Sequence, residues 1–471
     1  MIYCEINYYF KLIEEVKIMM KKRRKLKIFL LACAILALTV TGYILISGWI
    51  GGLPKLNYNY GENISPGPAY PDTDFIVISD IHAYDPSLGT SGSAFESVMK
   101  SDRKLLPESL ELLDYAVGEI LNSDAKFVII PGDLTKDGEI INHNILAQRL
   151  SKLTDAGIGV YVVPGNHDVN SPDALSFSGD ISTPVDSASR EDFSRIYEPF
   201  GYGAALKRDS GSLSYAAEPV DGLWLLAVDA CRFDENTPGQ KAAVGGKISQ
   251  ATADWIAETL EEADKLGKAV IAVMHHGAAE HWKGQSKLHP DYLIDEYKYF
   301  GELLASYNVR LIFTGHYHAQ DITRADFKND KYIYDVETGS LITAPCPIRY
   351  CSIRDNIFSS ETLTIVDKIR PGTDFAQKST DFVKTTVMLE AINTLKKYNV
   401  SDKDSDIIAD AVGDAFAAHY AGDENPDFRP FLDKSELSLW GRFILFMQQY
   451  VLDGLWADLE PGDNNISFSL D

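Results

Sequence analysis

Residues 160–168 read VYVVPGNHD, an apolar run that passes through Pro-Gly into an amide, an imidazole and a carboxylate. Three polar groups crowded at the end of a buried strand have no packing purpose, so this segment indicates a binding or catalytic site. The arrangement recurs in DFIVISDIH (74–82), FVIIPGD (127–133), AVIAVMHH (269–276) and RLIFTGHYH (310–318). Short apolar runs bounded by turn residues are typical of strands buried on both faces.

Helical patterns lie between and beside these strands. Amphipathic spacing predicts helices over residues 106–122, 139–153, 249–266 and 290–307. Strands that alternate with helices indicate crossover connections and a largely parallel sheet. In such sheets, functional groups gather beyond the carboxyl ends of the strands, which is where all five polar clusters lie.

The chain has a basic beginning and an acidic remainder. Residues 1–55 hold nine Lys or Arg and three Asp or Glu, so the formal net charge of −24 leaves about −30 on the rest. An acidic body repels long polyanions, and we therefore expect no nucleic-acid partner. A hydrophobic content of 45% excludes a disordered chain.

Residues 28–50 form an uncharged apolar run that follows KKRRKLK. The run is long enough to cross a bilayer as a helix, and the basic residues before it predict a cytoplasmic N-terminus. We expect a basic cytoplasmic segment over 1–27, a single-pass transmembrane signal anchor over 28–50, and an extracellular remainder at the cell membrane. Secretion after signal cleavage is the alternative, although no clear small-x-small site is present.

The remainder divides into three parts. Residues 51–72 are rich in Pro, Gly, Asn and Tyr and predict a linker, whereas residues 73–370 hold all five motifs. Residues 371–471 show amphipathic helical spacing without a strand-like run, which predicts a C-terminal helical domain or cap. Cys346 and Cys351 are close in sequence, and both a local disulfide and two free thiols fit them.

The polar clusters supply a consistent set of donor atoms. Oxygen and imidazole donors, with no thiolate, suit a pair of divalent transition metals. A carboxylate such as Asp133 can bridge two ions about 3.5–4 Å apart, and such a pair activates water and clamps a phosphoryl group. Each motif alone is weak, and the order and placement of all five carry the interpretation. The donors are Asp80, His82, Asp133, Asn166, His275, His316 and His318.

Together, D-x-H, GD, GNHD, the His pair and GHxH resemble the five blocks of the calcineurin-like metallophosphoesterase superfamily over residues 73–370. The resemblance implies an α/β fold in which two mixed β-sheets pack as a sandwich flanked by helices. It implies two divalent metal ions, such as Mn, Fe or Zn, and a non-ligand role for His167 beside the leaving group. The implied ligands are Asp80, His82, Asp133 and His318 for the first ion, and Asp133, Asn166, His275 and His316 for the second.

The chain also departs from parts of the family pattern. Lys136 in GDLTKDG stands where Ser/Thr phosphatases of the superfamily have Asp and purple acid phosphatases have Tyr. The combination with GNHD is most similar to a branch of bacterial phosphodiesterases that includes cyclic-nucleotide enzymes. The partner that orients His167 stays open between Asp137 and Asp168. Spacing does not choose between His275 and His276 as ligand, and only the family pattern favours His275.

The resemblance predicts hydrolysis of small phosphate esters by a metal-bridging hydroxide, with phosphodiesters preferred because the loops beside the motifs are acidic or neutral. Phosphomonoester or pyrophosphate-bond hydrolysis on the same site is the alternative, and a non-catalytic sensor or adhesion protein is a third hypothesis. Arg349 could hold a phosphate oxygen or form a surface salt bridge, and His276 is a further candidate substrate contact.

Overall fold

The computed structural model describes residues 56–58, 67–100 and 102–471. The predicted cytoplasmic segment 1–27 and transmembrane helix 28–50 lie outside the described residues. Among the residues that are described, no helix combines the length and apolar character needed to cross a membrane. The end of the predicted linker is packed, because Tyr70 is buried and its hydroxyl donates to the carbonyl of Val270 over 3.0 Å.

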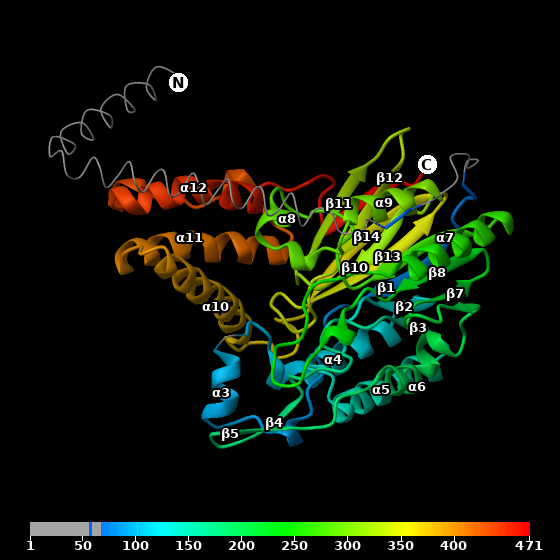
Figure 1. Cartoon of the computed structure of the whole chain (residues 1–471), viewed down its shortest axis with the longest axis horizontal. Coiled ribbons are helices and arrows are strands. Elements are labelled where there is room, and N and C mark those ends of the chain that lie inside the picture. Colours follow the sequence, from blue (N-terminus) through cyan, green and yellow to red (C-terminus); the bar gives the residue numbers. More distant parts are fainter. Residues whose placement is uncertain (1–55, 59–66, 101) are drawn as a thin grey trace. The chain divides into compact units, whose positions relative to one another are not determined.

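The first sheet has the strand order β15-β14-β13-β1-β2-β3 (Figure 1). Strands β1, β2 and β3 are parallel, whereas β13, β14 and β15 extend the sheet by antiparallel pairing. The bounds are β1 (Thr73–Val77), β2 (Phe127–Ile130), β3 (Gly159–Val162), β13 (Pro347–Arg354), β14 (Ile357–Thr364) and β15 (Asn465–Ser469).

The second sheet has the order β11-β12-β10-β9-β8-β7-β6. Its strands β12, β10, β9 and β8 are parallel, and antiparallel strands flank them on both sides. A separate hairpin joins β4 (Leu175–Ser178) to β5 (Ile181–Pro184). The bounds are β6 (Lys207–Arg208), β7 (Tyr215–Val220), β8 (Leu223–Val228), β9 (Ala269–Met274), β10 (Leu311–Thr314), β11 (Asp321–Asp326) and β12 (Tyr332–Glu337).

The two sheets share one apolar core. Phe75 of β1 stacks on Phe127 of β2 at 4.9 Å, and the edge of Phe313 from β10 meets Phe75 at 5.4 Å between ring centroids. Phe313 also packs against Phe358 of β14. Aromatic rings from both sheets thus interlock between them, so the predicted α/β fold with two mixed sheets is confirmed.

Helices flank the sandwich, and most begin and end close to the predicted positions. The predicted helix over 290–307 is wrong in its first part, because α9 begins only at Tyr297. Glu296 has a left-handed φ of 58°, which a helix interior excludes, and residues 290–292 form a single turn that leads toward the site. The bounds are α3 (Ser93–Met99), α4 (Ser109–Leu121), α5 (Ile140–Asp155), α6 (Arg190–Ile196), α7 (Gln250–Lys265), α8 (Gln285–Leu288) and α9 (Tyr297–Ser306).

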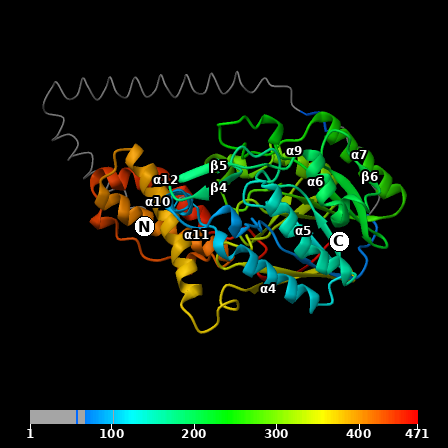
Figure 2. The same cartoon turned by 90° about the horizontal axis from the view of Figure 1, so that it is seen from below.

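The C-terminal region forms three helices, α10 (Phe375–Lys397), α11 (Asp402–Ala421) and α12 (Leu439–Leu455), which lie together beside the sandwich (Figures 1 and 2). Ser401 and Ser438 cap the N-termini of α11 and α12, because each hydroxyl accepts a backbone N–H of the first turn. The Ser438 amide also donates to Asp404 of α11, which links the two helices. The division of the chain near residue 370 stays a prediction.

The expectation that this region contains no strand is wrong at its end. Strand β15 pairs with β14, with Phe358 opposite Phe468. The ring of Phe468 also stacks on Tyr334 of the second sheet at 3.8 Å between centroids. The five-residue alternation in NISFS is too short to predict a strand, and it becomes one because its apolar face covers both sheets.

Cys346 and Cys351 are buried free thiols, so the disulfide alternative is wrong. Cys351 lies within β13, which starts at Pro347 directly after Cys346. Five residues of extended strand span about 16 Å. Cα atoms more than about 7 Å apart cannot be bridged without moving the backbone.

Candidate metal centre and active site

The structure brings all seven candidate ligands together at the carboxyl ends of five strands. The strands come from both sheets: β1, β2 and β3 of the first and β9 and β10 of the second. Two groups of donor atoms, each within 4.8 Å of one another, share the buried Asp133. The groups are Asp80, His82, Asp133 and His318, and Asp133, His275 and His316. Asn166 joins the second group, with its Oδ1 3.2 Å from His275 Nε2.

An unusual backbone conformation turns these side chains toward one centre. Asp80, His82 and Asp133 have φ values of 49°, 40° and 48°, and His316 and His318 have 75° and 68°. Non-glycine residues rarely adopt left-handed φ, and clusters of them are typical of functional sites where the surrounding structure enforces them. Here β1, β2 and β10 are each followed by one or two such residues, which redirect the chain and leave the side chains facing the site.

Two motif glycines allow the loops to approach one another. A Cβ on Gly165 would lie 2.1 Å from both the amide nitrogen and Oδ1 of Asp133. A Cβ on Gly315 would lie 2.2 Å from Ser79 Oγ and 2.4 Å from Asp80 Oδ2. Only glycine fits at these positions, because any side chain would push the GNHD and GHxH loops away from the carboxylates.

Backbone carbonyls orient the imidazoles. His275 Nδ1 lies 2.8 Å from the carbonyl of Pro131, and His82 Nδ1 lies 3.3 Å from that of Thr135. His316 contacts the carbonyl of Asp291 through Nε2, at 3.3 Å. A histidine that donates one N–H to a carbonyl is held in the tautomer whose other nitrogen is free to bind a metal.

Asp133 occupies a bridging position. Its Oδ2 lies 3.5 Å from His82 Nε2, and its Oδ1 lies 3.4 Å from His275 Nε2, so one oxygen faces each group. Burial alone would raise the pKa of Asp133, but three neighbouring histidines, with His275 the strongest, hold that pKa well below its usual range. An ionised carboxylate with one oxygen toward each donor group fits a pair of divalent ions. The donor set of carboxylate, amide and imidazole groups also suits divalent transition metals.

The structure distinguishes the two adjacent histidines. His275 lies in the second donor group, whereas His276 lies behind it. His276 is buried and donates from Nε2 to the carbonyl of Val244 over 2.9 Å. Burial lowers the pKa of His276 to about 3, so its imidazole is neutral. The hypothesis that His276 contacts substrate is therefore wrong, because no solvent-facing atom is available.

His167 is the partly exposed member of the site. Its side chain is 27% exposed, and its Nδ1 donates to Asp137 Oδ1 over 2.7 Å. Asp137, one of the two residues that the sequence left open, thus orients His167. Asp168 has another role: it accepts the backbone N–H groups of Leu134, Thr135 and Gly165 and so ties the GD loop to the GNHD loop.

Two of the expected basic groups do not face the site. Arg349 is fully buried, and its guanidinium donates to the carbonyls of Glu337 and Asp463. Both hypotheses for Arg349, a phosphate contact and a surface salt bridge, are therefore wrong. Lys136 is also buried and forms an ion pair with Asp137.

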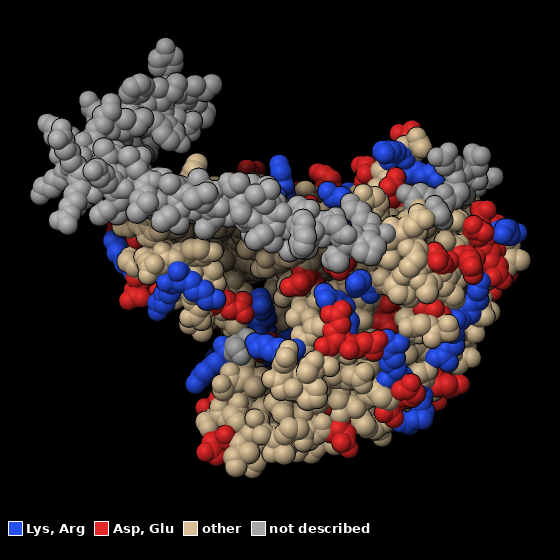
Figure 3. All heavy atoms as spheres, in the orientation of Figure 1, with Lys and Arg blue, Asp and Glu red and all other residues tan. Residues whose placement is uncertain are grey.

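Lys104 is a site residue that the sequence analysis missed. It follows α3 in a loop outside all five motifs, so no sequence signal pointed to it. Burial lowers the pKa of His82, and the Lys104 charge is the next cause. The same charge acts against protonation of His167, and the Lys104 ammonium also lies 3.8 Å from Asp102 Oδ2. Elsewhere on the face in Figure 3, acidic and basic side chains are interspersed.

The sequence profile described as calcineurin-like phosphoesterase matches residues 73–320, which is more than half of the chain. The chain belongs to the calcineurin-like phosphoesterase family. The protein is therefore a metal-dependent hydrolase of phosphate esters, and its fold implies a binuclear divalent metal centre whose metals are not identified. A comparison with curated protein sequences found no match.

Several solved structures resemble this phosphoesterase at low identity. A dimetal phosphatase from Danio rerio is 16% identical over 63% of this chain and 96% of that chain, with a TM-score of 0.44. Purple acid phosphatase PPD1 from yellow lupin is 13% identical over 64% and 53% of the two chains, with a TM-score of 0.39. NAD nucleotidase from Haemophilus influenzae is 13% identical over 62% and 47%, with a TM-score of 0.32.

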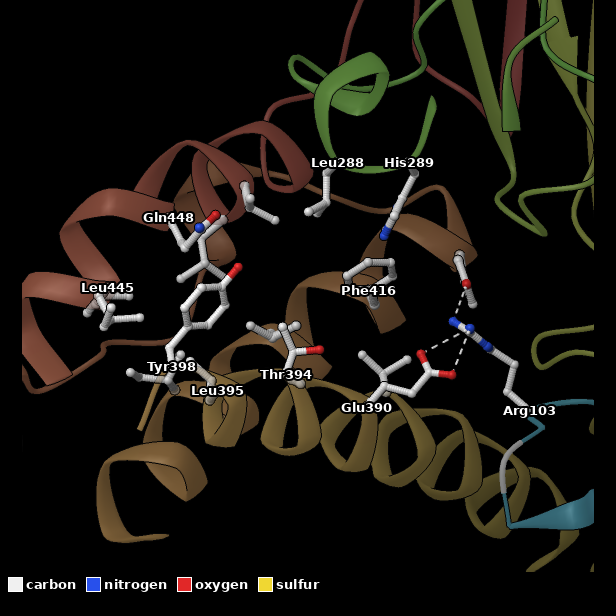
Figure 4. Close-up of a pocket in the computed structure, with 18 of the residues that line it drawn as sticks. Arg103, Leu288, His289, Glu390, Thr394, Leu395, Tyr398, Phe416, Leu445 and Gln448 are labelled. Carbon is white, nitrogen blue, oxygen red and sulfur yellow. Dashed lines mark hydrogen bonds and ion pairs between the residues drawn. The ribbon is translucent and has the colours of Figure 1, made fainter. Parts of the chain in front are cut away.

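The phosphoesterase has a cavity of about 390 Å³ beside the metal centre, between α10, α11 and α12 and the body. Tyr292 separates the two: its ring lies 4.6 Å from that of His316 and also lines the cavity. Figure 4 shows Arg103 at one end, paired with Glu390 of α10, and Leu445 toward the other. Apolar side chains make up most of the wall, among them Val387, Leu395, Ile408, Phe416, Ile444 and Leu445.

Proposed function

We propose that this phosphoesterase hydrolyses phosphodiesters, with one ester group leaving beside His167 and the other held in the cavity behind Tyr292. The observation that carries this proposal is the position of the cavity. Its wall begins at the ring that packs on His316, 4.6 Å away, whereas His167 contacts the Asp133 and His82 side of the centre. A phosphodiester has two organic groups, and the site offers a separate place for each.

The metal ligands are proposed from the donor geometry. Asp80, His82 and His318 would hold one ion, His275, His316 and Asn166 the other, and Asp133 would bridge them. Two divalent ions held in this way supply a strong nucleophile at neutral pH and stabilise charge on a phosphoryl group.

The remaining residues position and protonate the substrate. His167 donates a proton from Nε2 to the departing ester oxygen, while Asp137 fixes the ring through Nδ1. Lys104, whose charge acts on His167, attracts the phosphate and offsets part of its charge. Tyr292 lies on the opposite side, beside His316, and forms the start of the cavity wall.

Charge near the centre supports a diester over a monoester. A terminal phosphate dianion is usually held by several basic groups, whereas a diester carries a single negative charge. Lys136 and Arg349 are buried against other partners, whereas the charge of Lys104 acts on His82 and His167. A site of this kind favours the less charged ester.

Two nitrophenyl substrates test the diester preference. At equal metal loading, bis(4-nitrophenyl) phosphate should show a higher kcat/KM than 4-nitrophenyl phosphate. Both release the same leaving group, so the comparison isolates the second ester group and the charge. A higher kcat/KM for the monoester would contradict the proposal and leave the two-metal assignment in place.

A series of alkyl 4-nitrophenyl phosphates tests the cavity. Burial of each methylene is worth about 0.8 kcal/mol, so kcat/KM should rise by up to about fourfold per added CH₂ until the cavity is filled. Thr394→Trp should abolish this dependence, because Thr394 lines the cavity from the exposed side of α10. Asn393→Trp is the matched control, since Asn393 is exposed and lies outside the cavity. A chain-length dependence that survives Thr394→Trp would exclude this cavity.

We further propose, from the sequence, that residues 28–50 anchor the protein in the cell membrane with the phosphoesterase domain outside. The support is the uncharged run behind KKRRKLK. Protease added to intact cells should release the domain from a membrane-bound pool. A mature chain that begins after residue 50 and is recovered free in the medium would show a cleaved signal instead.

A further inference from the structure

A third group of donor atoms, which shares no residue with the two groups around Asp133, is buried where the C-terminal helices meet the body. It consists of Asp321 at the start of β11, His419 near the end of α11 and Glu424 in the loop that follows. One donor atom from each residue lies within 4.8 Å of the others. All three side chains are at least nine-tenths buried, with exposures of 0%, 0% and 5%.

Three polar atoms of this group have no hydrogen-bond partner among the described residues, although Asp321 Oδ2 lies 3.8 Å from His419 Nδ1. Asp321 Oδ2, Glu424 Oε2 and His419 Nε2 are buried without a hydrogen bond. The other atoms are used: Asp321 Oδ1 accepts from His281 Nδ1 over 2.6 Å, and His419 Nδ1 lies 2.5 Å from Glu424 Oε1. Leaving buried carboxylate oxygens unpaired is costly, and native proteins rarely do so.

The surroundings contain more buried acids than bases. Besides Asp321 and Glu424, the side chains of Asp335, Glu337 and Asp463 are buried nearby. His281 Nε2 lies 3.5 Å from both Asp335 Oδ2 and Glu337 Oε2, and the pKa of Asp463 is raised by burial and then by Asp321.

The available cations are Arg349, His281 and His419. Even with both imidazoles protonated, three positive charges face five carboxylates, which leaves a deficit of two. Each uncompensated buried charge costs several kcal/mol. Burial and neighbouring acids accordingly raise the pKa of Glu337 to about 8 and that of Asp463 to about 10. The cluster therefore needs either bound protons or a divalent cation.

We propose that Asp321, His419 and Glu424 bind a divalent cation that is separate from the catalytic pair. A neutral His419 as ligand leaves Arg349 and His281 against five carboxylates, a deficit of three, which a divalent ion reduces to one. Two carboxylates with one imidazole suit a transition metal such as Mn²⁺ or Zn²⁺. The ligands come from β11 and from the end of α11, about a hundred residues later, so the ion fastens the helical region to the body.

The position of this site connects it to the cavity. The ring of His419 lies 5.8 Å from that of Tyr317, and Tyr317 lines the cavity. Helix α11 also supplies Phe416 and Tyr420 to the same wall. A cation that holds the end of α11 thereby holds one wall of the substrate cavity, without itself touching the reacting phosphate.

Metal content provides the first test. The detergent-solubilised full chain, loaded with Mn²⁺ and desalted, should contain three metal equivalents by mass spectrometry. Glu424→Gln should contain two equivalents and melt at a lower temperature, and its Tm should rise less than that of the wild type on adding Mn²⁺, because only the catalytic pair is then filled. Asp423→Asn, an exposed neighbour, is the matched control and should keep three equivalents.

If the cluster binds protons instead of a cation, metal content and Tm should respond differently to Glu424→Gln. Without a cation, Glu424→Gln would remove one negative charge from an acidic cluster and would leave the metal content unchanged while raising Tm. Two equivalents in the wild type, or equal content in wild type and Glu424→Gln, would overturn the proposal. Neither result depends on which ester is hydrolysed, so this test is separate from that of the proposed function.

A second measurement requires no variant. Anomalous diffraction from wild-type crystals at the absorption edge of the loaded metal should show a peak between Asp321, His419 and Glu424 besides those at the catalytic centre. Two catalytic peaks with only a water-sized feature at the third position would overturn the proposal, even if Glu424→Gln fails to fold.

Discussion

Asp137→Asn tests how the acid His167 is positioned. The bond between His167 Nδ1 and Asp137 Oδ1 is 2.7 Å, which is typical of a charge-assisted hydrogen bond. Burial opposes ionisation of Asp137, but Lys136 and then His167 outweigh it and lower its pKa to about 2, so the carboxylate is charged. A hydrogen bond to a charged group is worth about 1.5–3 kcal/mol, so kcat should fall by about ten- to 150-fold.

The assay compares two diesters with good and poor leaving groups, bis(4-nitrophenyl) phosphate and a methyl phenyl phosphate. The loss should be larger for phenolate, which needs the proton from His167, and smaller for nitrophenolate. Metal content should equal that of the wild type, because Asp137 lies outside both donor groups. Tm is measured in parallel, since the change also removes a partner of the buried Lys136.

A double-mutant cycle with His167→Ala gives the decisive comparison. If Asp137 acts through His167, Asp137→Asn should have little further effect in the His167→Ala background. Equal losses in both backgrounds, or a wild-type kcat on the poor leaving group, would refute the positioning role.

Three further predictions follow from the same geometry. Asp133→Asn should lose both catalytic metals, measured by mass spectrometry, and turnover, while circular dichroism shows the fold retained; wild-type activity would refute the bridging assignment. Lys104→Gln should raise KM for the diester by about tenfold and change kcat less, whereas an unchanged KM would place Lys104 outside the site. Burial lowers the pKa of His143 to about 4, below the usual histidine pKa of 6.5, so the unfolded chain takes up a proton as the pH falls between these values. Chemical denaturation should therefore show that the wild type loses about 3 kcal/mol more stability than His143→Gln between pH 6.5 and 4, and parallel curves would contradict this.

The sequence by itself determined the elements and the donor set. Strand ends such as Asp80 and Asp133 are recognisable because an apolar run and the motif that follows it are local features of the chain. The parallel arrangement of β1, β2 and β3 then places their ends at one edge of the sheet. The helices of the C-terminal region are also local, since their amphipathic spacing and serine caps lie within each segment.

The tertiary structure decided which groups are partners. Asp168 is the sequence neighbour of His167 and Asp137 lies thirty residues away, yet the meeting of two loops gives Asp137 to His167 and Asp168 to backbone amides. Arg349 follows a strand as a phosphate contact might, yet packing against β14 buries it. Burial and long-range pairing depend on the whole fold, so no local pattern encodes them.

Contacts that depend on the whole fold also explain why Lys104 and the buried acidic group were not predicted from the sequence. Lys104 lies outside every motif and reaches the centre through a loop. Asp321, His419 and Glu424 are spread over about a hundred residues and carry no metal-binding spacing. Local sequence motifs place the metal-binding groups at the ends of the strands. The cavity and the buried acidic group arise only when the C-terminal helices dock, because both are made from surfaces that meet only in the folded chain.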